Sequence, residues 1–248
     1  MSVRVPLEQA SWRLTLYPDA GEAGGSFQSA RRTRHVWVPP GRSAEPDRAK
    51  AEAARRAKAK LRRYCAANRL NRLGTLTYAG SGCHDPRQAR ADVAEFFRDL
   101  REAVGGVALP YVWVPEWHKS DHGLHLHYAM GRWVSKSLLV RVWGRGFVNI
   151  KRLSDMPTGT TTREEARKAA GYLSKYVSKT FDRPDLGGLH RYEVAQGFQP
   201  RAVAISDTSS EGILAHAVQR MGAEPSRRWS SLGSEGWQGP PAVWFAWA

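Results

Sequence analysis

The sequence predicts an α+β fold in which helices pack on an antiparallel sheet. Between residues 70 and 180 the expected elements follow the order strand, helix, strand, strand, helix, strand, helix. The two consecutive strands form a hairpin, and hairpins mixed with helices are typical of ferredoxin-like or RRM-like folds. A chain of 248 residues also buries enough surface to build a sizeable hydrophobic core.

The N-terminal part of the chain changes character near residue 46. Residues 11–17 and 34–38 have the patterns expected of strands, and the Gly-, Ser- and Ala-rich stretch 19–30 between them predicts a loop. From residue 46 to about 70 the chain is dominated by Ala, Arg and Lys, which are good helix formers. We therefore expect a long basic helix before the sheet begins.

The next segment predicts the first core strand and a helix that covers the sheet. Residues 74–78 are rich in β-prone side chains. Asp85 and Pro86 then provide an N-cap and a proline at the first helical position. Apolar residues recur at helical spacing up to Val104, and two glycines at 105–106 end the helix.

A hairpin, a short helix and another strand follow. Residues 111–117 and 124–130 are strand-like runs separated by the polar turn 119–123, which predicts a hairpin. Residues 135–143 favour a short helix and residues 146–151 a further strand. These elements complete most of the expected sheet.

The last core element is a helix that begins at a capping box. Thr162 and Glu165 have the spacing of this motif, and the helix should run to about Lys179. Further on, residues 211–221 favour a helix and the aromatic stretch 240–248 a strand.

We therefore divide the chain into three parts. These are an N-terminal extension with the basic helix (1–70), a central domain (71–200) and a C-terminal extension (201–248).

The charge of the chain predicts a polyanionic partner. Lys and Arg number 38 against 23 Asp and Glu, which gives a formal net charge of +15. An excess of this size is typical of proteins that bind nucleic acid or an anionic lipid surface. The basic helix is either a solvated surface helix or a phosphate-contacting arm, in which case the contacts would come from Arg55, Arg56, Arg62 and Arg63.

Several classes of protein do not fit the sequence. An apolar run of membrane-spanning length is missing, and residues 1–10 lack the apolar core of a signal peptide. Cys65 and Cys83 are too few for a disulfide scaffold and lack the spacing of a zinc knuckle. We therefore expect a cytoplasmic protein with reduced thiols and no membrane partner.

Two histidines on one strand are the sharpest chemical feature. His125 and His127 are separated by Leu126, so in a strand both imidazoles lie on one face and Leu126 on the other. Glu116 lies on the preceding strand and shares that face if the register places it opposite either histidine, whereas a one-residue slip places it opposite Leu126. Two imidazoles and a carboxylate suit Mg²⁺ or Mn²⁺ bound to a phosphate oxygen.

Two tyrosines and two lysines share neighbouring faces of the last core helix. Tyr172 and Tyr176 are four residues apart, as are Lys175 and Lys179. Such a tyrosine pair is more often part of a core than catalytic, but two lysines beside it do not belong in a core. A tyrosine that attacks a phosphodiester needs a neighbouring cation, because its hydroxyl normally titrates near pH 10. Lysines can supply this positive charge.

Three motifs in this order resemble those of the HUH endonucleases, in particular the replication initiators of rolling-circle phages and plasmids, including the replication-associated family of filamentous phages. They are Leu-Gly-Thr-Leu-Thr-Tyr at 73–78, Gly-Leu-His-Leu-His-Tyr at 123–128, and Ala-Gly-Tyr-Leu-Ser-Lys-Tyr at 170–176. The resemblance covers roughly residues 70 to 200, which would make 71–200 the HUH endonuclease domain.

The resemblance implies a residue-by-residue assignment of the site. Glu116, His125 and His127 would hold a divalent metal, Mg²⁺ or Mn²⁺. Tyr172 and Tyr176 would be the nucleophiles, because some relatives use both tyrosines of a YxxxY pair in alternation. The first motif lies near the DNA in the family, which implicates Thr75, Thr77 and Tyr78.

The implied activity is that of a metal-dependent DNA endonuclease and strand transferase. It would nick and rejoin single-stranded origin DNA through a 5′-phosphotyrosine intermediate and leave a free 3′-hydroxyl for a host polymerase. The sequence lacks GxxxxGK[ST], so we expect a host helicase to unwind the duplex. The alternatives are a tyrosine transposase of the HUH type and a non-catalytic RRM-like nucleic-acid-binding protein.

Overall fold

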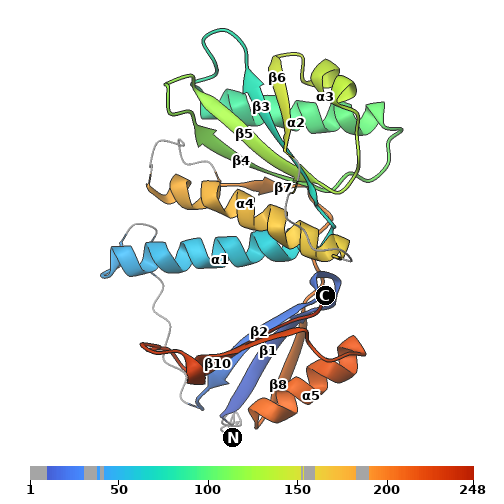
Figure 1. Ribbon diagram of the computed structural model, residues 1–248. Helices are drawn as coiled ribbons and strands as arrows, with labels where there is room; N and C mark the ends of the chain where they lie inside the picture. The colour runs from blue at the N-terminus through green and yellow to red at the C-terminus, as the bar shows by residue number, and fades with distance from the viewer. Residues whose placement is uncertain (1–9, 31–37, 40–41, 152, 154–159, 183–189) are drawn as a thin grey trace, which may run out of the picture. The chain divides into compact units, whose positions relative to one another are not determined.

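The computed structural model describes residues 10–30, 38–39, 42–151, 153, 160–182 and 190–248. The chain divides into two compact units, one formed by residues 45–199 and the other by residues 1–44 together with 200–248 (Figure 1). Each unit contains a five-stranded antiparallel sheet among the described residues. The predicted α+β class with antiparallel sheets and packed helices is therefore confirmed.

The unit of residues 45–199 has a sheet with the strand order β6-β3-β5-β4-β7. Its strands are β3 (Arg72–Tyr78), β4 (Tyr111–Trp117), β5 (Leu124–Met130), β6 (Gly146–Lys151) and β7 (Glu193–Val194). Its helices are α1 (Pro46–Ala67), α2 (Pro86–Ala103), α3 (Lys136–Trp143) and α4 (Thr162–Asp182).

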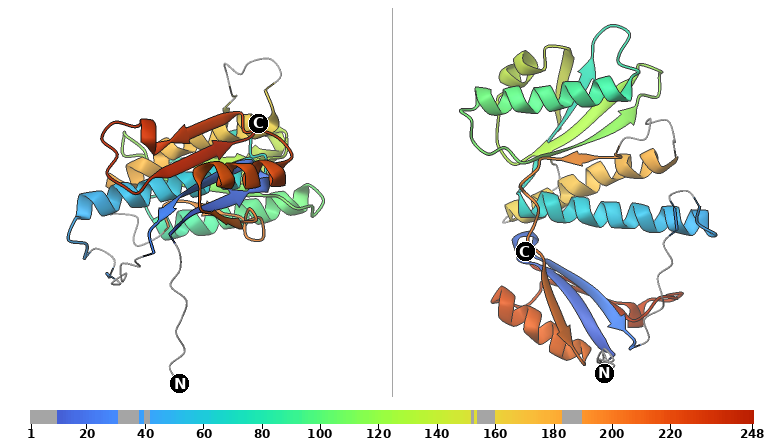
Figure 2. Two further views of the ribbon diagram at one scale, coloured as in Figure 1. Left: turned by 90° about the horizontal axis from the view of Figure 1, so that it is seen from below. Right: turned by 180° about the vertical axis from the view of Figure 1, so that it is seen from behind.

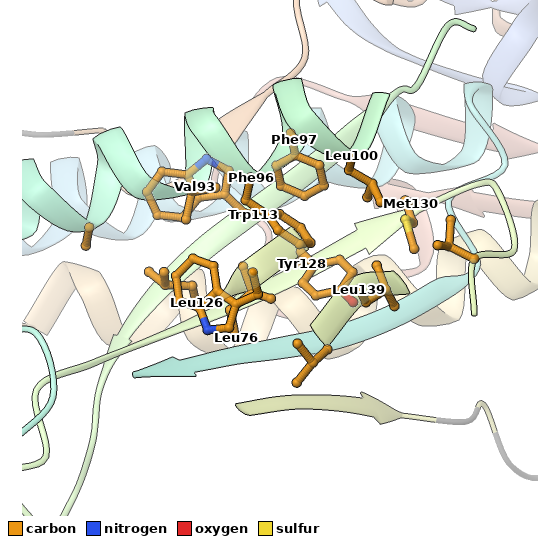
Figure 3. Close-up of a cluster of buried hydrophobic side chains, with 14 of the residues drawn as sticks. Leu76, Val93, Phe96, Phe97, Leu100, Trp113, Leu126, Tyr128, Met130 and Leu139 are labelled. Carbon is orange, nitrogen blue, oxygen red and sulfur yellow. The ribbon is translucent and has the colours of Figure 1, made fainter. Parts of the chain in front are cut away.

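One face of this sheet packs against α2 and α3. In α2, Phe96, Phe97 and Leu100 recur at helical spacing and contact the β5 side chains Leu126 and Tyr128 (Figure 3). The view from behind shows α2 crossing this face of the sheet (Figure 2). This core is dense in aromatic side chains and makes the sheet a rigid support for residues on its opposite face.

The opposite face packs against α4, which lies between the sheet and α1 (Figure 1). The buried residues of α4 include three alanines together with Leu173 and Val177. Small side chains let two elements approach α4 from different sides, because they keep the helix narrow. From α1, Leu61, Tyr64 and Cys65 complete this second core. The basic helix is thus part of the larger unit.

The second unit joins the two ends of the chain in one sheet, with the order β8-β1-β2-β10-β9. Its elements are β1 (Ser11–Tyr17), β2 (Glu22–Gln28), β8 (Val203–Asp207), α5 (Ser210–Met221), β9 (Arg227–Ser230) and β10 (Ala242–Ala246), with short 3₁₀ turns at Pro18–Ala20 and Ser231–Gly233. The helix α5 contacts β1 and β8. The two predicted extensions, 1–70 and 201–248, are therefore not separate appendages: residues 1–44 pair with 200–248, and residues 45–70 belong with the central unit.

The predicted loop at residues 19–30 is wrong, because β2 occupies most of it. Its Gly and Ala residues have low β propensity, but β2 pairs with β1 on one side and β10 on the other. At Gly25 a side chain would overlap the backbone of Arg13, so glycine permits the close pairing. The predicted strand at 34–38 lies almost entirely outside the described residues.

The capping box of α4 is shifted by one residue from the predicted pair. The hydroxyl of Thr161 accepts a hydrogen bond from the backbone N–H of Glu164, at 3.3 Å, and the Glu164 carboxylate accepts one from the Thr161 N–H, at 3.3 Å. Glu165 instead accepts a hydrogen bond from Asn71, with 2.6 Å between Nδ2 and Oε2. Within the described residues no helix has the length and hydropathy of a membrane span.

The packing of β3 against β5 gives a test of the fold. A Cβ at Gly74 would overlap the buried ring of Tyr128. We expect Gly74→Ala to lower the free energy of unfolding by about 1–3 kcal/mol, because the ring cannot move without disturbing the core. The midpoint of urea or thermal unfolding measures this effect.

The same substitution at Gly171 in α4 is the matched control. A Cβ there meets no atom within 4 Å, and alanine is the better helix former, so Gly171→Ala should raise the free energy of unfolding by about 0.5–1 kcal/mol. Equal stability of the two variants would contradict the packing described for Gly74.

Candidate functional site

The register of β4 and β5 brings the predicted acid and histidines to one face. Glu116 pairs directly with His125, and Val114 pairs with His127. Glu116, His125 and His127 therefore share the face covered by α4, and the slipped register that pairs Glu116 with Leu126 does not occur. Leu126 lies on the opposite face, in the core with α2.

His127 is fixed through both ring nitrogens. Its Nε2 lies 2.8 Å from Oε2 of Glu116, and its Nδ1 lies 2.9 Å from the hydroxyl of Thr75 on β3. The residue is 5% exposed. These contacts define the orientation of the ring and point Nε2 at the carboxylate.

Glu116 lies between His127 and a lysine of α4. Its Oε1 accepts a hydrogen bond from Nζ of Lys179. Partial burial raises the pKa of Glu116, but the hydrogen bonds from His127 and Lys179 outweigh burial and lower the pKa to about 2. The carboxylate is therefore ionised at neutral pH.

His125 is the second imidazole on this face. Its ring stacks on the ring of His118, with 4.3 Å between centroids, and His122 lies 6.3 Å away. Burial lowers the pKa of His125 to about 4, with further lowering by the neighbouring histidines His118, His127 and His122. The neutral ring that results at pH 7 is the form that binds metals.

The two tyrosines of α4 lie directly against this cluster. The ring of Tyr176 stacks on the ring of His127, with 3.7 Å between centroids and 12° between planes. Its hydroxyl donates a hydrogen bond to the hydroxyl oxygen of Tyr172, at 2.6 Å. Burial raises the pKa of Tyr176, and the hydrogen bond to Tyr172 and the charge of Glu116 raise it further.

Three ammonium groups surround the tyrosine pair. Nζ of Lys179 lies 5.2 Å from the ring centroid of Tyr176. Nζ of Lys175 lies 5.9 Å from the ring centroid of Tyr172, and Nζ of Lys151 lies 4.9 Å from the same centroid. Sequence reasoning missed Lys151, because the last residue of β6 approaches α4 only through the strand order of the sheet. The tyrosines and cations together can accept a phosphate.

The donor set suits a divalent cation in its chemistry. It offers an ionised carboxylate and two imidazoles on one sheet face, and Thr75 holds His127 as outer partners commonly hold ligand histidines. In the described residues, no three His, Cys, Asp or Glu side chains are grouped to hold a metal ion together. The positive charge next to Glu116 comes from Lys179.

The residues predicted to line the DNA divide between the two faces. Thr75 and Thr77 pair with His127 and His125 and share their face. Tyr78 lies on the opposite face, where its hydroxyl donates a hydrogen bond of 2.8 Å to the buried carboxylate of Asp92 and its ring contacts Trp143. This placement argues against the predicted DNA contact of Tyr78.

The arginines of α1 are not part of this cluster. Arg55 and Arg56 are exposed, and Arg56 forms an ion pair with Glu52 at 3.7 Å. Arg55 and Arg62 line a groove of about 620 Å³ along α1 that extends to Ser178 of α4. Arg63 is partly buried on the same helix. The groove places these cations near the C-terminal turns of α4, adjacent to Lys179.

Comparison with known proteins gives one match. Residues 71–181 match the family described as Replication-associated protein ORF2. This match spans less than half of the chain but includes β3, the β4–β5 hairpin and nearly all of α4. Comparison with curated proteins and with solved structures finds no match.

The position of Tyr78 gives a second test. We expect Tyr78→Phe to lower the free energy of unfolding by about 1–3 kcal/mol, because it removes a buried hydrogen bond to a carboxylate. Affinity for single-stranded DNA should not change, because the side chain faces α2. Urea unfolding and fluorescence anisotropy with a labelled oligonucleotide measure the two effects. Weaker DNA binding with unchanged stability would contradict the placement.

Proposed function

We propose that this protein initiates rolling-circle replication by nicking and rejoining single-stranded origin DNA. One observation supports this above all: Tyr176 stacks on His127, whose ring is hydrogen-bonded to Glu116. A tyrosine pair thus lies against an acid–histidine cluster, as the chemistry of a tyrosine nuclease requires. The match of residues 71–181 to a replication-associated family supports the same conclusion.

The proposed reaction exchanges one phosphodiester for another. A tyrosine hydroxyl oxygen attacks the phosphorus and forms a bond to it, and the bond between phosphorus and the 3′ oxygen breaks. The phenolic proton is lost and the departing 3′ oxygen takes up a proton, so that a 5′-phosphotyrosine and a free 3′-hydroxyl result. Attack by a 3′-hydroxyl on the phosphotyrosine reverses these steps and rejoins the strand.

Within this proposal, Tyr172 makes the first attack. Its oxygen accepts the hydrogen bond from Tyr176, and the ammonium groups of Lys151 and Lys175 lie near its ring. These cations can neutralise the phosphate as the bond forms. Burial raises the pKa of Tyr176 and makes this hydroxyl the weaker nucleophile. Tyr176 then serves in the second strand transfer.

We further propose that Glu116, His125 and His127 bind Mg²⁺ or Mn²⁺. The ionised state of Glu116 and the neutral ring of His125 at pH 7 support this assignment. The metal would polarise a phosphate oxygen and so make the phosphorus more electrophilic. Lys179 would assist with the charge of the phosphate, since its ammonium group already lies at the carboxylate.

The proposed DNA path follows the polar face of the sheet. Thr75 and Thr77 lie beside the histidines, and the arginines of α1 supply phosphate contacts that do not depend on sequence. The free 3′-hydroxyl would serve a host polymerase, and a host helicase would separate the strands. A phage or plasmid in a bacterial cytoplasm provides this setting.

Replacement of the tyrosines tests the nucleophile. In a reaction of Mn²⁺ with single strands tiling the replicon that encodes the protein, the wild type should form a covalent DNA adduct. Tyr172→Phe should reduce the adduct at least about 100-fold, because the weaker nucleophile remains, and the double variant with Tyr176→Phe should form none. Denaturing gels and mass spectrometry of the DNA-linked peptide measure the outcome.

The control for this experiment is Tyr17→Phe, since Tyr17 lies in the other unit. This variant should form the adduct at the wild-type rate. An adduct that survives in the double variant would refute the assignment of the nucleophile.

Removal of the metal tests the cation site. EDTA should abolish nicking, and added Mn²⁺ should restore it. Glu116→Gln should weaken Mn²⁺ binding by more than about 10-fold, because it removes the charged ligand. Titration of Mn²⁺ followed by electron paramagnetic resonance measures binding without reference to activity, with His216→Ala in the other unit as the control. Full nicking in EDTA would rule out the metal site.

A further inference from the structure

A cavity of about 690 Å³ lies at the end of the sheet where β3 begins and β5 and β6 end. The segment between β5 and α3 forms one wall, and Trp133 in this segment is 71% exposed. A large exposed aromatic at the mouth of a cavity is unusual for a side chain with only a structural role.

The lining of the cavity is polar and cationic around an apolar floor. Tyr128, Met130 and Leu139 belong to the buried core below it. The cations that line it are Arg72, Arg132, Lys136 and Lys151. Against these four cations the lining contains one carboxylate, that of Glu165, which accepts a hydrogen bond from Asn71.

The cavity is continuous with the tyrosine site within the same unit. Lys151 lines the cavity, and its Nζ lies 4.9 Å from the ring centroid of Tyr172. Asn149 also lines it and pairs on the sheet with Thr75, which holds His127. A strand with a phosphate at Tyr172 therefore has the cavity within the reach of a neighbouring nucleotide.

We propose that this cavity binds an unstacked base of the DNA strand next to the cleaved phosphate. Trp133 stacks on the base, Asn149 offers an amide to its edge, and the cations contact the flanking phosphates. This inference rests on the proposed function, because it takes Tyr172 as the point at which DNA is cleaved. The cavity would make cleavage depend on the base at one position.

The size and chemistry of the cavity favour single-stranded DNA over the other polyanions. A volume of about 690 Å³ lies within the range of small-ligand sites and is suited to one nucleotide. Bases of a duplex are stacked and cannot enter, whereas a base in a single strand can rotate out. An anionic lipid surface would use the cations but would leave the aromatic wall and the amide without a role.

Binding measured without cleavage tests this inference. A fluorescein-labelled 20-nucleotide single strand of mixed sequence is titrated with protein in EDTA, and anisotropy gives the affinity. Trp133→Ala should weaken binding about 5- to 100-fold, because it removes one base-stacking contact. Trp133→Phe should restore much of the affinity, since it keeps an aromatic face. Affinity for the same sequence as a duplex should be the same for all variants.

Trp237→Ala is the matched control, because this tryptophan is 41% exposed in the other unit. It should leave binding unchanged, and thermal unfolding should show that Trp133→Ala is folded. In a second measurement, strands with 5-iododeoxyuridine at successive positions are photocrosslinked and mapped by mass spectrometry. Crosslinks to residues 132–136 from one position support the proposal.

Equal affinity of Trp133→Ala and the wild type, or crosslinks confined to other segments, would overturn the proposal. These outcomes are independent of the adduct experiment. Loss of the adduct assignment with Trp133-dependent binding would refute the nuclease and keep the base site. An adduct on Tyr172 with binding that ignores Trp133 would do the reverse.

Discussion

The pairing of Glu116 with His125 across the β4–β5 hairpin is the constraint on which the site depends. Side chains alternate between the faces of a strand, so a shift of one residue would move Glu116 into the aromatic core beneath the sheet. The same shift would expose Val114 in its place. The apolar residues of β4 and β5 therefore fix the register, and the polar cluster follows from the packing of the core.

The helix α4 converts this sheet face into a chemical site. Its buried face contacts both the sheet and α1, which leaves the helix little freedom to rotate. With Leu173 and Val177 fixed in the core, Tyr172 and Tyr176 must project over the edge of the same face. The position of the tyrosines relative to His127 is thus set by apolar packing on both sides of one helix.

The sequence was sufficient for the elements of this unit and for the composition of the cluster. Periodicity located the helices and the hairpin, and alternation placed both imidazoles on one face. The choice between registers needed the structure, as did the contact of Lys179 with Glu116, because it depends on the rotation of α4 above the sheet. Motif resemblance could not show that Tyr78 faces α2, because the motif does not record which face each residue occupies. The β2 strand and the joining of both chain ends in one sheet depend on contacts between distant segments.

The charge of the site follows from this arrangement. The ionised Glu116 is balanced by Lys179 within the cluster, so that Lys151 and Lys175 are an excess of positive charge around Tyr172. A phosphate brings the negative charge that this excess attracts, and in a partly buried site the attraction is stronger than at an exposed surface. The overall charge of +15 attracts any polyanion, whereas the cations around Tyr172 attract a phosphate to one hydroxyl. The chemistry therefore depends on a few lysines placed by β6 and α4, and the net charge alone does not predict it.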